Sequence, residues 1–354
     1  MRITMPRNDL ARLLSATTKV VESRNTIPVL STVRLVADGG KLTATATDLD
    51  IEIQSGVAAE AEEDGAFCVS ATLLDNIVKK LPPLPDVLLA ESDGTLTVKA
   101  GRYTSRLQTL PVTDFPSFSV DGFTSHFDVD LSALFAPCAF AISTEKTRYY
   151  LNGIYLADDG STLTAVATDG HRLARHTADG VSKFEGVIVP RKAVSLVPKG
   201  TVSVSLSNAK IRITSGETVV TSKLIDGSFP DYERVIPKGN DKVVTFGSDD
   251  MRRATDRVAV VSSERARAVK LSFADNMATL TVNNPDSGTA TEEVSVSYDG
   301  EPVEVGFDAS YLTELVGQFP AGDVKLALAD GGSPTVFTSD NAPNLLAVLM
   351  PRRV

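Results

Sequence analysis

The chain repeats one pattern three times at a spacing of about 120 residues, and this feature constrains its fold more than any other. The stretches Phe67–Pro82, Val187–Gly200 and Val305–Pro320 each pass from a short β-rich run into apolar residues with helical spacing. A second set, Ile3–Val21, His126–Ser143 and Val243–Ser262, repeats in step and places cap-forming residues before each helical pattern. Each unit is large enough to bury its own core, so the pattern predicts three similar α+β domains rather than a solenoid.

The predicted domains cover residues 1–120, 121–240 and 241–354. Turn residues cluster at both junctions, near Asp121-Gly122 and at Lys238–Asp241. Each domain is expected to contain two helices and many short strands, arranged as a βαβ-type half that occurs twice. A third repeated set supports this, because Ser105–Pro116 is echoed by Thr221–Tyr232.

Composition narrows the class of protein. Of 354 residues, 42% are hydrophobic, which suffices for several cores, and no apolar run is long enough to span a membrane. The first residues lack the layout of a signal peptide. Two cysteines, Cys68 and Cys138, lie in apolar settings without metal-binding spacing. We therefore expect a cytoplasmic protein with two buried, reduced thiols, without membrane association, metal or other cofactor.

The net charge of −10 disfavours nucleic acid as a partner, but the charge is unevenly distributed. Basic and acidic residues number 12 and 15 in residues 1–120, 13 and 13 in 121–240, and 10 and 17 in 241–354, giving balances of −3, 0 and −7. Basic residues accompany five of six predicted helices, whereas Ala309–Phe319 has none. Such residues either form solvated faces or build one surface that contacts phosphates without reading sequence. They are Arg7, Arg12, Lys19, Arg24, Lys79, Lys80, Lys146, Arg148, Arg191, Lys192, Lys199, Arg252, Arg253, Arg257, Arg265 and Arg267.

The stretch ATDGHRLAR, Ala167–Arg175, has the residue types of a catalytic or metal-binding turn. The chain has only three histidines, His126, His171 and His176, and it lacks HExxH, CxxC, GxSxG and phosphate-loop motifs. The equivalent stretch of the first unit, ATDLDIEIQ, lacks Gly, His and Arg. Gly170-His171-Arg172 therefore either forms a local turn or serves a task of the middle unit alone. A hydrolase or other enzyme using Asp169 and His171 is the alternative function.

Several long motifs closely resemble the bacterial sliding clamps, the β subunits of the DNA polymerase III holoenzyme. They are RYYLNG (Arg148–Gly153), ATDGHRLA (Ala167–Ala174), VIVPRKAV (Val187–Val194), SKLIDGSFPDYERVIPK (Ser222–Lys238) and the terminal MPRRV. The motifs occur in order, and the triplication extends the resemblance over the whole chain. The resemblance implies a DNA-clamp fold, with a head-to-tail homodimer forming a ring of six domains. Helices line the hole, sheets form the rim, and duplex DNA threads the hole.

The resemblance also implies a function without catalysis. Sliding clamps give the polymerase processivity in replication and repair; they have no 3′–5′ exonuclease activity of their own. The expected partners are DNA held topologically, a second copy of the chain, the clamp loader, the replicative polymerase α subunit and other proteins with clamp-binding motifs. A ligand-binding module that has adopted the clamp fold is a further alternative.

The family docks short linear peptides in a groove between the middle and last domains. One position departs from the family pattern, because Arg352 replaces an apolar residue and could narrow the groove or favour acidic peptides. The matching positions in this sequence are Leu151, Thr168, Gly170, His171, Arg172, Leu173, Pro230, Arg234, Val235, Val348, Met350, Pro351 and Arg352.

Two further surfaces follow from the resemblance. The expected DNA-contacting residues are Arg24, Arg148, Tyr149, Tyr150, Lys192 and Lys199, where the two tyrosines either stack on an exposed base or pack between domains. The ring interface is expected to join a basic surface of the first domain to an acidic surface of the last. Its residues are Lys79, Arg102, Arg106 and Leu107 on one side, with Val260, Val261, Glu292 and Glu293 on the other.

Overall fold

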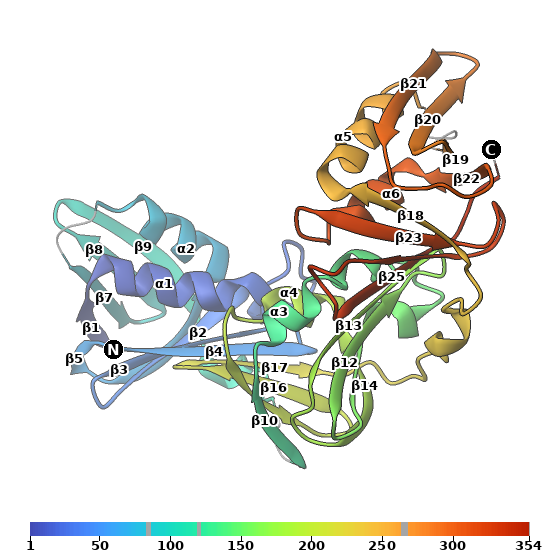
Figure 1. Ribbon diagram of the computed structural model, residues 1–354. Helices are drawn as coiled ribbons and strands as arrows, with labels where there is room; N and C mark the ends of the chain where they lie inside the picture. The colour runs from blue at the N-terminus through green and yellow to red at the C-terminus, as the bar shows by residue number, and fades with distance from the viewer. Residues whose placement is uncertain (83–85, 119–121, 263–267, 354) are drawn as a thin grey trace. The chain divides into compact units, whose positions relative to one another are not determined.

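The computed structural model describes residues 1–82, 86–118, 122–262 and 268–353 and divides into two compact units (Figure 1). The first unit contains Met1–Leu131 and Ser195–Leu224, and the second contains Ser132–Val194 and Ile225–Val354. Asp121, at a predicted junction, and the basic residues Arg265 and Arg267 lie outside the described residues.

The first unit is built on one antiparallel sheet of 13 strands in the order β10-β15-β16-β17-β4-β3-β2-β6-β9-β8-β7-β1-β5. Strand β17 pairs with β4 over five residue pairs, Thr218↔Ser55 to Ser222↔Ile51, so strands from the first and middle thirds share this sheet. The strands are β1 (Arg2–Met5), β2 (Thr32–Asp38), β3 (Lys41–Thr47), β4 (Ile51–Ala58), β5 (Glu60–Glu63), β6 (Gly65–Ser70), β7 (Val87–Ser92), β8 (Thr95–Ala100), β9 (Tyr103–Leu110), β10 (Ser125–Val129), β15 (Val202–Leu206), β16 (Lys210–Ser215) and β17 (Thr218–Lys223).

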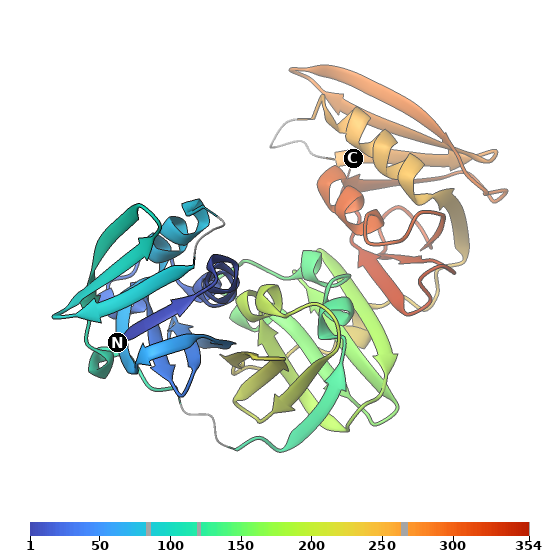
Figure 2. The same ribbon diagram turned by 90° about the vertical axis from the view of Figure 1, so that its left-hand side faces the viewer.

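Two helices, α1 (Arg7–Thr17) and α2 (Ala71–Lys80), pack against each other beside this sheet (Figure 2). Helix α1 buries Leu10, Leu13, Leu14 and Thr17 at helical spacing. The Arg7 guanidinium of α1 donates hydrogen bonds to the carbonyls of Val78 (3.0 Å) and Lys79 (2.6 Å) at the end of α2. It thereby adds to the capping of α2, where the N–H of Leu81 already donates to the carbonyl of Val78 (3.3 Å).

The second unit contains an eight-stranded sheet, β14-β11-β12-β13-β25-β24-β23-β18, and a four-stranded sheet, β21-β20-β19-β22. Strand β13 pairs with β25 from Arg172↔Leu349 to His176↔Leu345 and so joins the middle third to the last third. The strands are β11 (Gly153–Asp158), β12 (Thr162–Thr168), β13 (Arg172–Asp179), β14 (Phe184–Pro190), β18 (Lys242–Gly247), β19 (Ala268–Ala274), β20 (Met277–Asn284), β21 (Gly288–Ser295), β22 (Val303–Asp308), β23 (Asp323–Leu328), β24 (Thr335–Thr338) and β25 (Leu345–Leu349).

The helices of the second unit include the paired α5 (Ser248–Ala259) and α6 (Ala309–Val316), which enclose the core of the last third. Asp308 caps α6, because its carboxylate accepts the backbone N–H groups of Ser310 (3.0 Å) and Tyr311 (3.3 Å). Two short helices, α3 (Leu131–Phe135) and α4 (Arg191–Leu196), lie in the middle third. Six α-helices are therefore present in the described ranges, as the repeat predicts.

The predicted βαβ-type halves are wrong in their strand pairing. A βαβ unit joins parallel strands, whereas every ladder between the described strands is antiparallel. The order strand, helix, strand does occur, but β1 and β2 on either side of α1 are not neighbours in the sheet. Short hairpin connections instead join many of the strands that are neighbours in a sheet. No helix in the described part of the chain is long and apolar enough to cross a membrane.

Candidate functional site

The stretch singled out in the sequence forms the tight turn between β12 and β13. Asp169 Oδ1 accepts the backbone N–H groups of His171 (2.9 Å) and Arg172 (3.0 Å). The hydroxyl of Thr168 accepts the N–H of Gly170 (3.1 Å) and donates to the carbonyl of Arg172 (2.8 Å). Gly170 has a φ of 89°, a left-handed conformation that favours glycine. The turn is therefore held by its own side chains, and the Asp169 carboxylate is engaged in forming it.

The Arg172 side chain joins this turn to helix α6. Its Nε donates to Asp169 Oδ2 (3.1 Å), and its Nη1 pairs with Glu314. The guanidinium carbon lies 4.3 Å from the ring centroid of Tyr311 and 5.0 Å from that of Phe140. These contacts leave the side chain only 10% exposed. Arg172 therefore acts as a clip between the middle and last thirds, and its charge is already paired within the chain.

The three histidines lie in different places. His171 is exposed, with its ring centroid 6.2 Å from that of Tyr311, and its carbonyl accepts the N–H of Met350 (2.8 Å). His176 Nδ1 bonds to the carbonyl of Leu134 (3.0 Å), and His126 bonds to Ser205 in the first unit. Among the described residues, no group of three or more His, Cys, Asp or Glu side chains is placed to hold a metal. Asp169 and His171 thus lack the third group that a triad or metal site requires.

An apolar layer supports the predicted groove. Leu173 of β13 pairs with Val348 of β25, and both side chains are buried together with Val166. The segment before β18 packs on this layer through Phe229, Tyr232 and Ile236. Leu151, also buried, ends the short 3-10 helix η5 (Tyr149–Leu151). The buried members of the predicted set therefore form the base of the site, and they offer little direct contact area.

The exposed members of the predicted set surround this base. Val235 is 52% exposed at the end of the 3-10 helix η6 (Tyr232–Val235), and Met350 is 39% exposed after β25. Pro230 is exposed, Pro351 is half-buried, and Arg234 pairs with Asp231 at 2.7 Å. All thirteen predicted groove residues belong to the second unit. Their chemistry suits a peptide, because apolar side chains alternate with backbone and charged groups that orient a bound chain.

Arg352, the departure from the family pattern, is paired within the chain. Its Nη1 donates to Asp308 Oδ2 (2.7 Å), while its backbone N–H donates to the carbonyl of Gly306 (2.8 Å). The side chain remains 48% exposed, whereas that of Asp308 is 9% exposed. The cation therefore lies against the N-cap of α6, where a carboxylate offsets part of its charge.

The predicted DNA-contacting residues differ in exposure and in how firmly contacts within the chain hold their side chains. Arg148 donates two hydrogen bonds of 2.8 Å to the Glu145 carboxylate and one of 3.0 Å to the carbonyl of Asp169. The bonds to Glu145 raise the pKa of its guanidinium. Tyr149 is 53% exposed and meets Tyr150 edge-on, with centroids 5.8 Å apart. The remaining predicted residues are the exposed Arg24 and Lys199 of the first unit and the half-buried Lys192 of the second.

The predicted interface residues lie on or near strands β9 and β21 and helices α2 and α5. Arg102 precedes β9, and Arg106 is exposed on it, whereas Leu107 is buried in the core of the first unit. Glu292 and Glu293 lie on β21, where Glu292 pairs with Arg257 of α5. Lys79 pairs with Asp75 one helical turn earlier, Val260 is 80% exposed, and Val261 packs on the core of the last third.

Sequence reasoning missed the contribution of α6 to the site. Tyr311 and Glu314 hold Arg172, and Tyr311 also lies beside His171. Because α6 carries no basic residue, its sequence gave no indication of a contact with a partner. Its tyrosine, the only aromatic residue within the helix, was the available signal.

Family models for the DNA polymerase III beta subunit match residues 1–119 (N-terminal domain), 129–231 (central domain) and 233–353 (C-terminal domain). The beta sliding clamp of Caulobacter vibrioides is 44% identical, and that of Escherichia coli is 33% identical, each over the full length of both chains. The structure of a sliding clamp from Bartonella birtlesii bound to griselimycin has a TM-score of 0.96 and 41% identity, covering both chains completely.

These matches agree with the three-domain DNA-clamp architecture predicted from the internal repeat, and with a non-catalytic processivity subunit rather than a hydrolase. The groove residues, the triplicated fold and the full-length relatives lead to one conclusion: the chain belongs to the bacterial β sliding clamps, the β subunits of DNA polymerase III.

Proposed function

We propose that the protein is a DNA sliding clamp that encircles duplex DNA and tethers the replicative polymerase. The observation that carries this proposal is the ordered match of three clamp domains over residues 1–353 of a 354-residue chain. We place the domains at residues 1–120, 121–240 and 241–354. The protein acts in the cytoplasm, without a cofactor, and its DNA contact is independent of sequence.

The ring is proposed to be a head-to-tail homodimer closed by pairing of two sheet edges. Within the described strands, β21 pairs only with β20, and the first half of β9 pairs only with β8. Unpaired strand edges are templates for pairing with another chain. The exposed Arg106 on β9 and Glu293 on β21 supply opposite charges for this contact.

Docking partners are proposed to insert a short peptide into the groove formed by the thirteen residues described above. They include the replicative polymerase α subunit, the clamp loader and other proteins that carry clamp-binding motifs. The exposed Val235, Met350 and Pro230 supply apolar contacts, and His171 lies at the rim. Arg24, Arg148, Tyr149, Tyr150, Lys192 and Lys199 are proposed to contact DNA.

A loading experiment tests the clamp function. With a clamp loader and ATP, the labelled protein should remain on nicked circular DNA through gel filtration and leave the same DNA after linearisation. Light scattering should give twice the chain mass at micromolar concentration. Equal loss from circles and linear DNA would refute topological binding and favour the alternative of a ligand-binding module.

A second experiment tests the groove. Replacing His171 and Arg172 together with alanine should weaken binding of a peptide from the replicative polymerase about tenfold or more, because a rim side chain and the clip that holds the rim are both lost. Dimer mass should remain unchanged. Unaltered peptide affinity would remove these residues from the docking site.

A further inference from the structure

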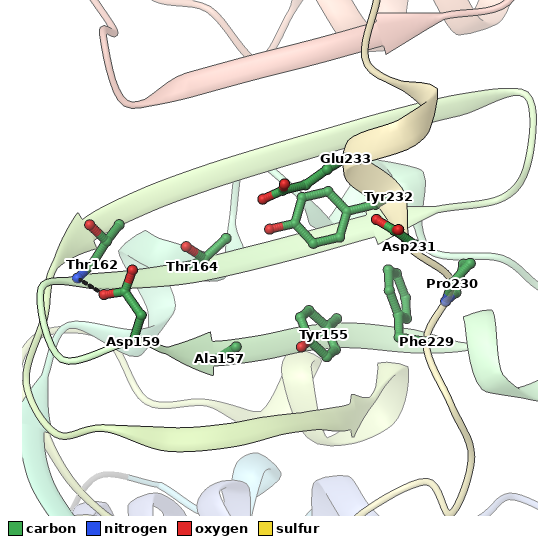
Figure 3. A pocket seen from close by; sticks show the side chains of 10 residues that line it. All are labelled: Tyr155, Ala157, Asp159, Thr162, Thr164, Phe229, Pro230, Asp231, Tyr232 and Glu233. Carbon is green, nitrogen blue, oxygen red and sulfur yellow. Dashed lines mark hydrogen bonds between the residues drawn. The ribbon is translucent and has the colours of Figure 1, made fainter.

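The second unit contains a pocket of about 420 Å³ that lies next to the groove and shares Pro230 with it (Figure 3). It lies between strands β11 and β12 and the segment that leads into η6. Tyr155 of β11 forms one wall, and Phe229 and Tyr232 form the wall next to it. Asp159, Asp231 and Glu233 complete the charged part of the lining.

The aromatic wall presents ring faces. Tyr155 and Phe229 are stacked with centroids 5.0 Å apart and planes inclined by 18°, and Tyr232 lies 6.2 Å from Tyr155. Gly186 on neighbouring β14 makes room for this stack, because a Cβ atom there would lie 2.0 Å from Oη of Tyr155. Burial raises the pKa of Tyr155 and of Tyr232, so both rings are neutral at physiological pH.

The polar lining is acidic. The ten residues around the pocket include three carboxylates and no Lys, Arg or His. Hydrogen bonds from Ser161, followed by those from Thr162, lower the pKa of Asp159. Asp231 forms an ion pair with Arg234, while the exposed side chain of Glu233 extends beside Tyr232 (Figure 3). Neutral ring faces next to carboxylates form an environment that attracts an organic cation.

The equivalent place in the first unit already contains cations. The segment Phe115-Pro116-Ser117-Phe118 corresponds to Phe229-Pro230-Asp231-Tyr232 in the repeat. Arg34 of β2 lies over Phe115 at 4.8 Å, and Lys210 of β16 lies over Phe118 at 5.1 Å.

In the second unit the cation has been replaced. Strand β2 lies between β3 and β6, as β11 lies between β12 and β14, and Tyr155 occupies the third position of its strand as Arg34 does. Ser117 and Ser119 of the first segment correspond to Asp231 and Glu233 of the second. The repeat thus conserves the aromatic wall, has a tyrosine at the position of Arg34 and adds two acids. The charge of Arg175, on β13, still acts on Tyr232, but Arg175 does not line the pocket.

We propose that this pocket binds an arginine or lysine side chain from the peptide segment flanking the docking motif of a partner seated in the groove. The pocket and the groove are continuous, because Pro230 belongs to both and η6 carries Tyr232 on one and Val235 on the other. Arginine fits best, since its planar guanidinium stacks on rings and binds carboxylates through two bonds. The inference rests on the proposed groove function and extends it to partner selectivity.

The test compares peptides that differ only in charge. A labelled polymerase-derived peptide is extended at either end with arginine-containing or alanine-only segments, and its affinity is measured by fluorescence anisotropy. One arginine extension should tighten binding to the intact protein about threefold to tenfold over its alanine counterpart. Equal affinities of the arginine and alanine peptides at both ends would overturn the proposal.

Three variants test whether the peptide arginine binds in this pocket. Glu233→Gln should reduce the arginine advantage and leave the alanine peptide unaffected, whereas Glu301→Gln, the same charge change outside the pocket lining, should reduce nothing. Gly186→Ala should abolish the advantage without any change of charge, since its new methyl group displaces the Tyr155 ring. An arginine advantage that survives both Glu233→Gln and Gly186→Ala would place the cation elsewhere and refute the pocket.

Failure of the groove is distinguishable from failure of the pocket. If the alanine peptides do not bind the intact protein at all, the groove assignment fails. The pocket is then tested alone with N-acetyl-arginine amide at millimolar concentration, monitored by NMR of labelled tyrosine rings. Shifts of the Tyr155 and Tyr232 signals that disappear in Gly186→Ala support the cation site, and unshifted signals overturn it.

Discussion

Replacing Arg172 with alanine should loosen the junction between β13 and α6 by about 3 kcal/mol. The bond to the largely buried Asp169 contributes about 1.5–2 kcal/mol, and the two ring contacts about 1 kcal/mol each. The pair with Glu314, whose side chain is 52% exposed, adds at most about 0.5 kcal/mol. These contributions sum to about 4 kcal/mol, and we expect less because interactions that share one side chain are not additive.

Hydrogen exchange measured by mass spectrometry reads this local stability directly. A loss of about 3 kcal/mol should speed exchange about a hundredfold in peptides that cover β13 and α6. Arg172→Lys should give a smaller increase, because it retains the charge but loses the planar fork. Arg12→Ala is the matched control, since Arg12 is 75% exposed and its ion pair is with Asp9, a neighbour on the same helix. An increase below about fivefold for Arg172→Ala would show that the clip does not stabilise this junction.

Three shorter predictions concern the two thiols and two glycines. Burial raises the pKa of Cys68 to about 11 and that of Cys138 to about 12, so at pH 8 neither thiol should react with Ellman's reagent until the protein unfolds, when both should react. Because these folded pKa values are raised, the two thiols favour the folded state below about pH 9, and thermal unfolding should show that this contribution is lost as the pH rises toward 11–12. Gly153→Ala should lower the melting temperature more than Gly170→Ala. A Cβ atom at Gly153 would lie 2.2 Å from the backbone carbonyl oxygen of Val189 on the paired strand β14, which cannot easily move. At Gly170 the Cβ atom would lie 2.6 Å from the movable end of the Arg148 side chain, and the strained φ would cost about 1 kcal/mol.

The sequence predicted those features that depend on local pattern. Periodicity and caps located the helices, and the internal repeat identified three similar domains. Counting three histidines and finding no partner motifs argued against an active site, and Asp169 does form the turn instead. The resemblance supplied the thirteen groove residues, which lie together in the second unit. Their roles as individual contacts stay predictions.

Other features depend on contacts between distant parts of the chain. Arg172 and Glu314 are separated by 142 positions, and nothing in either local pattern indicates that they pair. The bonds of Arg7 could not be predicted for the same reason, because the carbonyls that accept them lie in α2, 71 and 72 positions away. Arg7 is therefore not a freely exposed cation. Antiparallel pairing was missed because the order of strand, helix and strand along a chain does not determine which strands become neighbours in a sheet.

The ladder between β4 and β17 has a consequence for dissecting the protein. A fragment that ends at residue 120 would keep β4 but lose β17, leaving five residues of the sheet without their partners. Such an edge is long enough to recruit another fragment, so the isolated first third should self-associate or precipitate. A severed middle third would face the same problem twice, at β17 and at β13. The pieces that suit separate expression are therefore defined by shared ladders, and these do not coincide with the repeats along the sequence.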